Sequence, residues 1–222
     1  VRTKLYSLGN GFFRNVWVFM EDHSENFVVL KTLRSNHDYD DQNYERHRMD
    51  AIALERLTSS SYVLDIYAFC GTSSIVELGY GAKSIADDAL WNTNHHHYKQ
   101  QQQQQQKGDQ RKQKLTSIER LVIASQVAQA IADVHYNHNN NNNDNYPTIV
   151  HGDIMLDQFI LTKDGIYKLN DFNRCVFIYH RNITTTTSQQ QHLEPCPYRF
   201  EDENAWLFRS PEEYNESLLT EK

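Results

Sequence analysis

The 222-residue chain has few cysteines, an excess of acidic residues and no long apolar run. Its three cysteines, Cys70, Cys175 and Cys196, form no Cys-x-x-Cys pair. This excludes a dense disulfide scaffold and a cysteine-rich zinc site, and it fits a reducing compartment. Lys and Arg number 22 against 29 Asp and Glu, so the net charge of −7 disfavours a chain that wraps a nucleic acid backbone.

Membrane and export signals are also lacking in the sequence. No apolar stretch approaches the roughly 18 residues that a spanning helix needs, and no secretory leader opens the chain. We therefore expect an intracellular, cytoplasmic protein with no nucleic acid partner and no membrane contact within this sequence. Because the first residue is Val1 rather than Met, we expect a piece of a longer protein, whose flanks could still carry a membrane attachment.

Two low-complexity tracts interrupt the chain, near 92–114 and 137–145. The first contains three adjacent histidines and a run of glutamines, and the second is nearly all asparagine. Neither carries apolar residues that could offset the entropy cost of ordering, so we expect mobile surface insertions. The histidines have no second ligand cluster beside them, so we do not expect a metal site there.

The remaining sequence predicts a segregated α+β fold. Apolar, β-branched and aromatic runs predict strands, and a 3.6-residue period predicts helices. We expect strands at 12–19, 27–33, 62–70, 74–78, 159–161 and 166–169, and helices at 44–57 and 115–135. Thr116 and Glu119 form a capping box at the start of the second helix. Its predicted apolar stripe consists of Leu121, Ala124, Val127, Ile131 and Val134.

A glycine turn and a lysine in an apolar strand are the first chemical signals. Gly9 and Gly11 stand one residue apart, and a third glycine is absent because Arg14 takes its place. Lys31 ends the run Val-Val-Leu-Lys, where an ammonium is costly unless it meets an anion. We expect Asp50 to be its partner, with Glu55 in reserve, although either acid could instead be a solvated helix residue.

A pair of acids flanks the hairpin predicted at 159–169. Asp153 precedes it in His-Gly-Asp, and Asp171 follows it in Asn-Asp-Phe. Strand pairing should bring both carboxylates to one edge of the hairpin. Phosphoryl transfer needs one carboxylate to orient the attacking hydroxyl and another to hold Mg²⁺ on the phosphates. Either acid alone could equally cap a turn.

These motifs, in this order, resemble a eukaryotic-type protein kinase domain. The matching features run from the glycine turn through Lys31, the loop 151–158 and Asp171-Phe172-Asn173 to Ser210-Pro211-Glu212. The resemblance implies a two-lobed fold, with a small antiparallel β lobe carrying one helix and an incomplete, mainly helical lobe. We expect the lobes to be residues 1–78 and 79–222. Threonines 184–187 would lie in the activation segment, as phosphosites or as solvated loop.

The resemblance also implies roles for individual residues, with ATP and Mg²⁺ as cofactors and a protein as substrate or scaffold partner. Asp153 would be the catalytic aspartate and Lys31 would contact the α- and β-phosphates. Asp171 and Gln158 would be the metal ligands. The remaining nucleotide-binding residues would be Gly9, Gly11, Val16, Asp50, Val76, Glu77 and Gly79, of which Glu77 and Gly79 would present backbone groups to the adenine edge.

Several positions depart from the family pattern. Gly152 replaces the arginine beside the catalytic aspartate, Met155 replaces a lysine near the γ-phosphate, and Gln158 replaces an asparagine. A thioether cannot stabilise developing negative charge. We therefore expect ATP-dependent phosphoryl transfer to a protein Ser, Thr or Tyr hydroxyl, with a catalytically weak or inactive pseudokinase scaffold as the alternative. A small-molecule kinase is a third possibility, because His-Gly-Asp also occurs in such enzymes.

Overall fold

A computed structural model of the chain describes residues 4–20, 27–80, 84–85, 115–136, 148–184, 191–198 and 219. The described elements, in chain order, are β1 (Lys4–Asn10), β2 (Arg14–Met20), β3 (Phe27–Leu33), α1 (Asp41–Arg56), β4 (Ile66–Cys70), β5 (Ser73–Glu77), α3 (Ser117–His135), β6 (Ile149–Val150), η3 (Leu156–Gln158), β7 (Phe159–Leu161), β8 (Tyr167–Leu169), β9 (Val176–Phe177), β10 (His180–Thr184) and β11 (Gln191–Pro195). The predicted α+β class is confirmed by this five-stranded sheet with its accompanying helices.

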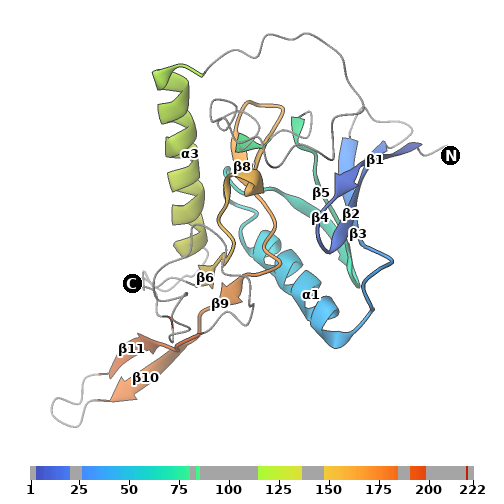
Figure 1. Ribbon diagram of the computed structural model, residues 1–222. Helices are drawn as coiled ribbons and strands as arrows, with labels where there is room; N and C mark the ends of the chain where they lie inside the picture. The colour runs from blue at the N-terminus through green and yellow to red at the C-terminus, as the bar shows by residue number, and fades with distance from the viewer. Residues whose placement is uncertain are drawn as a thin grey trace, which may run out of the picture.

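The main sheet is antiparallel, with strand order β1-β2-β3-β5-β4. The strands predicted at 12–19 and 27–33 are confirmed as β2 and β3, which pair antiparallel with Val16 opposite Lys31. Residues 4–10, for which the sequence pattern predicted no strand, pair with β2 at the edge of the sheet. As Figure 1 shows, α1 runs close to this sheet, whereas α3 stands at the other side of the molecule.

Helix α1 begins three residues earlier than the 3.6-residue pattern predicted. The reason is the capping residue Asp40, whose side chain accepts a hydrogen bond from the Asn43 backbone N–H. Leu54 and Leu57, both part of the predicted apolar face, are buried in the core. Asp50 lies one turn before Leu54 and is also fully buried, so this helix carries an acid into the interior.

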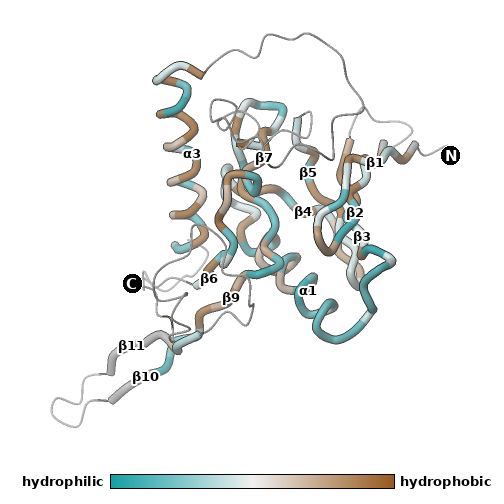
Figure 2. The backbone as a smooth tube through the Cα atoms, in the orientation of Figure 1, coloured by the Kyte–Doolittle hydropathy of each residue, from teal (hydrophilic) through white to brown (hydrophobic). Residues whose placement is uncertain are grey.

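Helix α3 has the predicted capping box, in which Thr116 and Glu119 satisfy each other's backbone N–H groups. The predicted apolar stripe is only partly correct. Ala130 and Val134 are buried in the C-terminal half, where the helix contacts β6 and β8. Leu121 and Ala124 are exposed, because the N-terminal half of the helix extends beyond the elements it packs against (Figure 2).

The predicted hairpin of β7 and β8 is present, with Leu161 opposite Tyr167. Its second strand, β8, forms backbone hydrogen bonds with the segment that follows α1. The Leu64 N–H donates to the Leu169 carbonyl, and the Leu169 N–H donates to the Tyr62 carbonyl, at 3.0 and 2.8 Å. These bonds hold residues 170–172 beside the sheet and α1.

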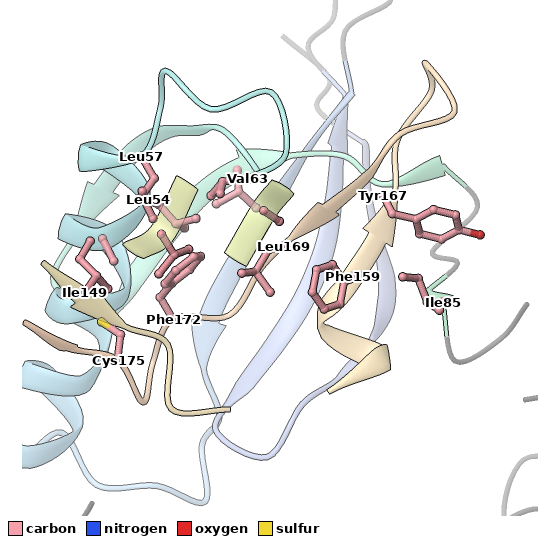
Figure 3. Packing of buried hydrophobic residues seen from close by; sticks show 14 of the residues in the cluster. Leu54, Leu57, Val63, Ile85, Ile149, Phe159, Tyr167, Leu169, Phe172 and Cys175 are labelled. Atoms are coloured by element: carbon pink, nitrogen blue, oxygen red, sulfur yellow. The ribbon is translucent and has the colours of Figure 1, made fainter. Parts of the chain in front are cut away.

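One hydrophobic core joins the sheet, both helices and the hairpin (Figure 3). Leu54 from α1, Leu169 from β8 and Phe172 from the following loop are each fully buried within it. Burial of an apolar side chain at each such position contributes about 1.5–3 kcal/mol to the free energy of unfolding, and this stabilises the arrangement of these segments. The core therefore fixes the backbone on both sides of Asp171.

Several predictions concern residues outside the described part of the chain. These are the low-complexity tracts, most of the threonine run and Ser210-Pro211-Glu212. The division into residues 1–78 and 79–222 stays a prediction. Among the helices that the structure describes, none has the length and apolar character needed to cross a bilayer.

Candidate functional site

Lys31 belongs to β3, and its side chain is buried on one face of the main sheet, as its place in an apolar strand predicted. It is 6% exposed, and its Nζ donates a hydrogen bond of 2.8 Å to Oδ1 of Asn170. Burial lowers the pKa of Lys31, as does the charge of Arg14, while Asp50 and Asp171 oppose the shift. The ammonium therefore lies within electrostatic reach of another cation and of two carboxylates.

Arg14 is the second buried cation of the site, although in the sequence motif it stood out only as the residue in place of a third glycine. Side chains alternate along β2 and β3, so Arg14 and Lys31 share one face of the sheet as diagonal neighbours. The guanidinium donates from Nη1 to Oδ2 of Asp50 at 2.6 Å and from Nη2 to Oδ1 of Asp171 at 2.9 Å. Burial disfavours its charge, but the two carboxylates outweigh burial and raise the pKa of Arg14.

Asp50 does not have the partner that the sequence analysis assigned to it. Its carboxylate accepts from Arg14 and, at 2.7 Å, from the Phe172 backbone N–H, while Lys31 bonds to Asn170 instead. The reserve candidate Glu55 is exposed on the other side of α1. Burial favours the neutral form of Asp50, but Arg14 and Lys31 outweigh it and hold the pKa of Asp50 below its usual range.

We refer to Arg14, Lys31, Asp50, Asn170 and Asp171 as the Arg14 network. It joins β2, β3, α1 and the loop after β8 through three hydrogen-bonded pairs between side chains. Its formal charges cancel, with two cations and two anions. Buried charges persist in a fold when they are paired in this way, because an unpaired one would carry its full desolvation cost.

The loop before η3 brings Asp153 to the same region through His151. The Asp153 N–H donates to Nδ1 of His151, and Nε2 of that ring lies 3.0 Å from the Asn170 carbonyl. Since Nδ1 accepts, the neutral ring carries its proton on Nε2 and donates it to the carbonyl. Burial lowers the pKa of His151, and Asp171 and Asp153 both oppose that shift, so both acids act on this ring.

Two further side chains approach the Asp153 carboxylate. Nε2 of Gln158 donates to its Oδ2 at 3.4 Å, and the Arg174 guanidinium lies 3.9 Å from its Oδ1. Arg174 follows the Asp-Phe-Asn triplet and was not identified from the sequence. Gly152 has a φ of 75°, a backbone conformation that glycine adopts without strain, which explains why no larger residue stands beside Asp153.

Asp171 has a φ of 62°, in the left-handed region that few residues other than glycine adopt. Such a conformation persists only where the surroundings hold it. Phe172, fully buried with its ring centroid 4.5 Å from that of His151, and the Asp50 bond to its N–H provide that hold. The backbone thus directs the Asp171 carboxylate to Arg14.

Arg14 already supplies positive charge at one of the predicted magnesium ligands, Asp171. It engages one oxygen of that carboxylate, Oδ1, while Gln158 directs its amide N–H₂ group to Asp153. The described residues also contain no group of three or more His, Cys, Asp or Glu side chains that could hold a metal ion. A divalent cation at the other oxygen of Asp171, whose side chain is 31% exposed, would lie close to the Arg14 guanidinium and be repelled by it.

The glycine turn joins β1 to β2 and is tied to the residues after β3. The Gly11 N–H donates to the Arg14 carbonyl, and the Gly11 carbonyl accepts from the Arg34 guanidinium at 3.1 Å. The next residue, Phe12, accepts from the His37 ring through its carbonyl, and the Arg46 guanidinium lies over the Phe13 ring. Gly9 lies at an irregularity in the β1–β2 pairing. Because it donates to the Arg14 carbonyl, the backbone N–H of Gly11 is already used within the turn.

The predicted adenine-binding residues lie at the end of β5. Val76 is buried, and the Glu77 N–H donates to the Asp65 carbonyl. The Glu77 carboxylate binds Lys168 at 2.8 Å, and Asp65 lies 3.5 Å from the same ammonium. We refer to Lys168, Glu77 and Asp65 as the Lys168 cluster. Gly79 allows close packing of Ile160, because a Cβ there would lie 2.1 Å from its Cγ2.

Comparison of the chain with protein-family models gives no match, and comparison with curated proteins finds no similar one. The resemblance to protein kinases thus depends on the sequence motifs alone.

Proposed function

We propose that this chain binds ATP beneath the main sheet and transfers its terminal phosphoryl group to a hydroxyl of a protein substrate. The proposal extends the α+β fold to a two-lobed kinase-like one. The observation that carries it is the approach of Lys31, Arg14 and Asp171, from three separate segments, to one small region beside Asp153. Buried cations at a sheet face are suited to the charge of a triphosphate.

In this proposal each residue has a separate task. The Lys31 ammonium would exchange its bond to Asn170 for the α- and β-phosphates. Asp153 would orient the attacking hydroxyl and accept its proton, with its carboxylate held by Gln158 and Arg174. Val16, opposite Lys31, and the end of β5 would border the nucleotide base.

A comparison of Asp153→Asn with Asp164→Asn tests this function. Asp164 is an exposed acid in the turn between β7 and β8, so its substitution removes the same charge away from the site. The full chain should phosphorylate a protein or peptide library, and Asp153→Asn should reduce the rate at least 100-fold while ATP still binds. Equal rates for the two variants would contradict the role of Asp153, and transfer only to small alcohols would contradict the protein substrate.

A second candidate function is a nucleotide-binding scaffold without turnover. It is favoured by the bond between Arg14 and Asp171, which engages the acid expected to act on the phosphates. Met155, in the loop that carries Asp153, brings no charge to act on the phosphates in place of Asp171. ATP that raises the melting temperature of the chain, with no phosphoryl transfer to any acceptor, would favour this candidate over the first.

A further inference from the structure

The Arg14 guanidinium lies at the acid where a metal-dependent site would need its divalent cation. It bonds to Asp171 at 2.9 Å and to Asp50 at 2.6 Å, and its side chain is only 6% exposed. A cation beside this carboxylate reduces the repulsion between the carboxylate and the phosphates of a nucleotide. Here a side chain of the protein already provides that cation.

Arg14 is held in this position from both directions. Its carbonyl accepts from the Gly11 N–H, and the preceding Phe13 carbonyl accepts from the Arg34 N–H at 3.0 Å. Arg14 also pairs with Leu33 across the sheet. A divalent cation that took Asp171 would leave the guanidinium with Asp50 alone in a buried place. The like charges of Arg14 and a divalent cation at Asp171 would repel each other, and Arg14 has the advantage of fixed geometry.

We propose that this site binds nucleotide without a divalent cation, because Arg14 supplies the positive charge at Asp171. The inference rests on the proposed nucleotide site and specifies its cofactor requirement. Arg14 neutralises Asp171, and Lys31 remains available to the phosphates once it exchanges its bond to Asn170. Two of the five guanidinium N–H donors serve the carboxylates, so further donors remain for a phosphate oxygen that enters the site.

The test measures the dissociation constant of ATP by calorimetry, in EDTA and in excess Mg²⁺, on the full chain. The wild-type protein should bind with constants that differ less than threefold between the two conditions. Arg14→Gln should weaken binding in EDTA at least tenfold, and Mg²⁺ should restore part of that loss. Arg48→Gln is the matched control, since within the described part of the chain Arg48 pairs with neighbouring Glu45 alone, on the surface of α1, and it should behave as wild type.

A second variant covers the case in which Arg14→Gln does not fold. Asp171→Asn keeps an oxygen that accepts from Arg14 but removes the charge that a metal would need. The inference predicts that this variant binds ATP in EDTA at least as tightly as wild type and gains nothing from Mg²⁺. A tenfold loss of affinity confined to the Mg²⁺ condition would overturn it.

The outcomes separate the inference from the function on which it rests. ATP binding by the wild-type protein only in Mg²⁺ overturns the inference and leaves the nucleotide site standing. Absence of binding in both conditions overturns the nucleotide site and the inference with it. Equal binding in both conditions, with Arg14→Gln dependent on Mg²⁺, is the result that supports both.

Discussion

The Arg14 network and the Lys168 cluster both join basic and acidic side chains, but they differ in burial. The side chains of Arg14 and Asp50 are 6% and 0% exposed, although that of Asp171 is 31% exposed, whereas those of Lys168, Glu77 and Asp65 are 12%, 19% and 35% exposed. Solvent screens the second set, and water can solvate a partner that loses its pair. Water cannot reach Arg14 and Asp50 in this way, so these two buried charges depend on each other.

This difference indicates separate purposes. The Lys168 cluster ties the end of β5 to the hairpin, and small changes there should be tolerated. The Arg14 network holds two acids at a place where the backbone of Asp171 is in the left-handed region and Phe172 is fully buried. Energy spent on such an arrangement is characteristic of a functional site.

The largest expected effect is a difference in the free energy of unfolding between two variants, each of which removes a cation from one set. Arg14→Gln leaves Asp50 buried beside a neutral amide, and we expect a loss of about 3–5 kcal/mol in the free energy of unfolding. Lys168→Gln should cost about 1 kcal/mol or less. Chemical denaturation of both variants measures the two losses. Equal losses would show that burial does not separate the two sets.

A pH titration sharpens the comparison through His47, which is 1% exposed on α1 beside the Arg14 network. Neither ring nitrogen has a hydrogen-bond partner among the described residues, and burial, with the charge of Arg14, lowers the pKa of His47 to about 4 from 6.5. The unfolded state therefore binds the proton at higher pH than the native state. The contribution of His47 to stability should be constant above pH 6.5, fall by about 3 kcal/mol as the pH drops to 4, and level off below.

The measurement for His47 is the free energy of unfolding against pH. Between pH 6.5 and 4, His47→Leu should reduce the slope of this plot by the amount that corresponds to the binding of about one proton. Some slope will remain, because burial also lowers the pKa of His151. Asp50 acts in a separate window: its pKa is lowered from 3.8, so its contribution is complete above that pH and is lost as the pH falls further. An unchanged slope in His47→Leu would contradict this assignment.

A smaller effect is expected at the end of β5. Gly79→Ala forces Ile160 to move, and we expect a loss of about 1–3 kcal/mol. Gly11→Ala is the matched control, because the nearest heavy atom to its Cβ would be the Arg14 carbonyl at 3.7 Å, an ordinary contact. Adding Ile160→Ala to Gly79→Ala should recover part of the loss. No recovery in a denaturation experiment would show that the contact is not the cause.

The smallest expected effect is a difference in thiol reactivity between two cysteines. Burial raises the pKa of the Cys175 thiol, whereas Cys70 is exposed. A thiol reagent at neutral pH should label Cys70 rapidly and leave Cys175 unlabelled until the protein unfolds, as mass spectrometry would show. Rapid labelling of Cys175 in the folded protein would indicate that the core around Phe172 opens readily.

Local signals in the sequence predicted the parts of the fold that depend on neighbouring residues. The capping box of Thr116 and Glu119 and the turn of Thr162 to Gly165 were correct because each is complete within a few residues. The burial of Lys31 also followed from its apolar strand. The face of α3 was only partly correct, because burial there depends on which other elements it meets.

The partners within the site could not be predicted, since they depend on distant segments. Asp50 was correctly placed on the inner face of α1, but whether Lys31 or an unrecognised cation would reach it depends on the twist of the sheet and the path of residues 170–172. One signal for Arg14 was available. It shares the inward face of β2 with Val16 and Val18, and a charge there requires a buried partner.

The most direct test of the account compares Lys31→Gln with Lys163→Gln, an exposed lysine in the β7–β8 turn, in a thermal melt with and without saturating ATP. We predict that ATP raises the melting temperature of the wild-type chain and of Lys163→Gln by several degrees, and that Lys31→Gln loses this shift. An absent shift in the wild-type chain, or an equal shift in Lys31→Gln, would contradict the claim that a nucleotide binds at the buried cations beneath the sheet.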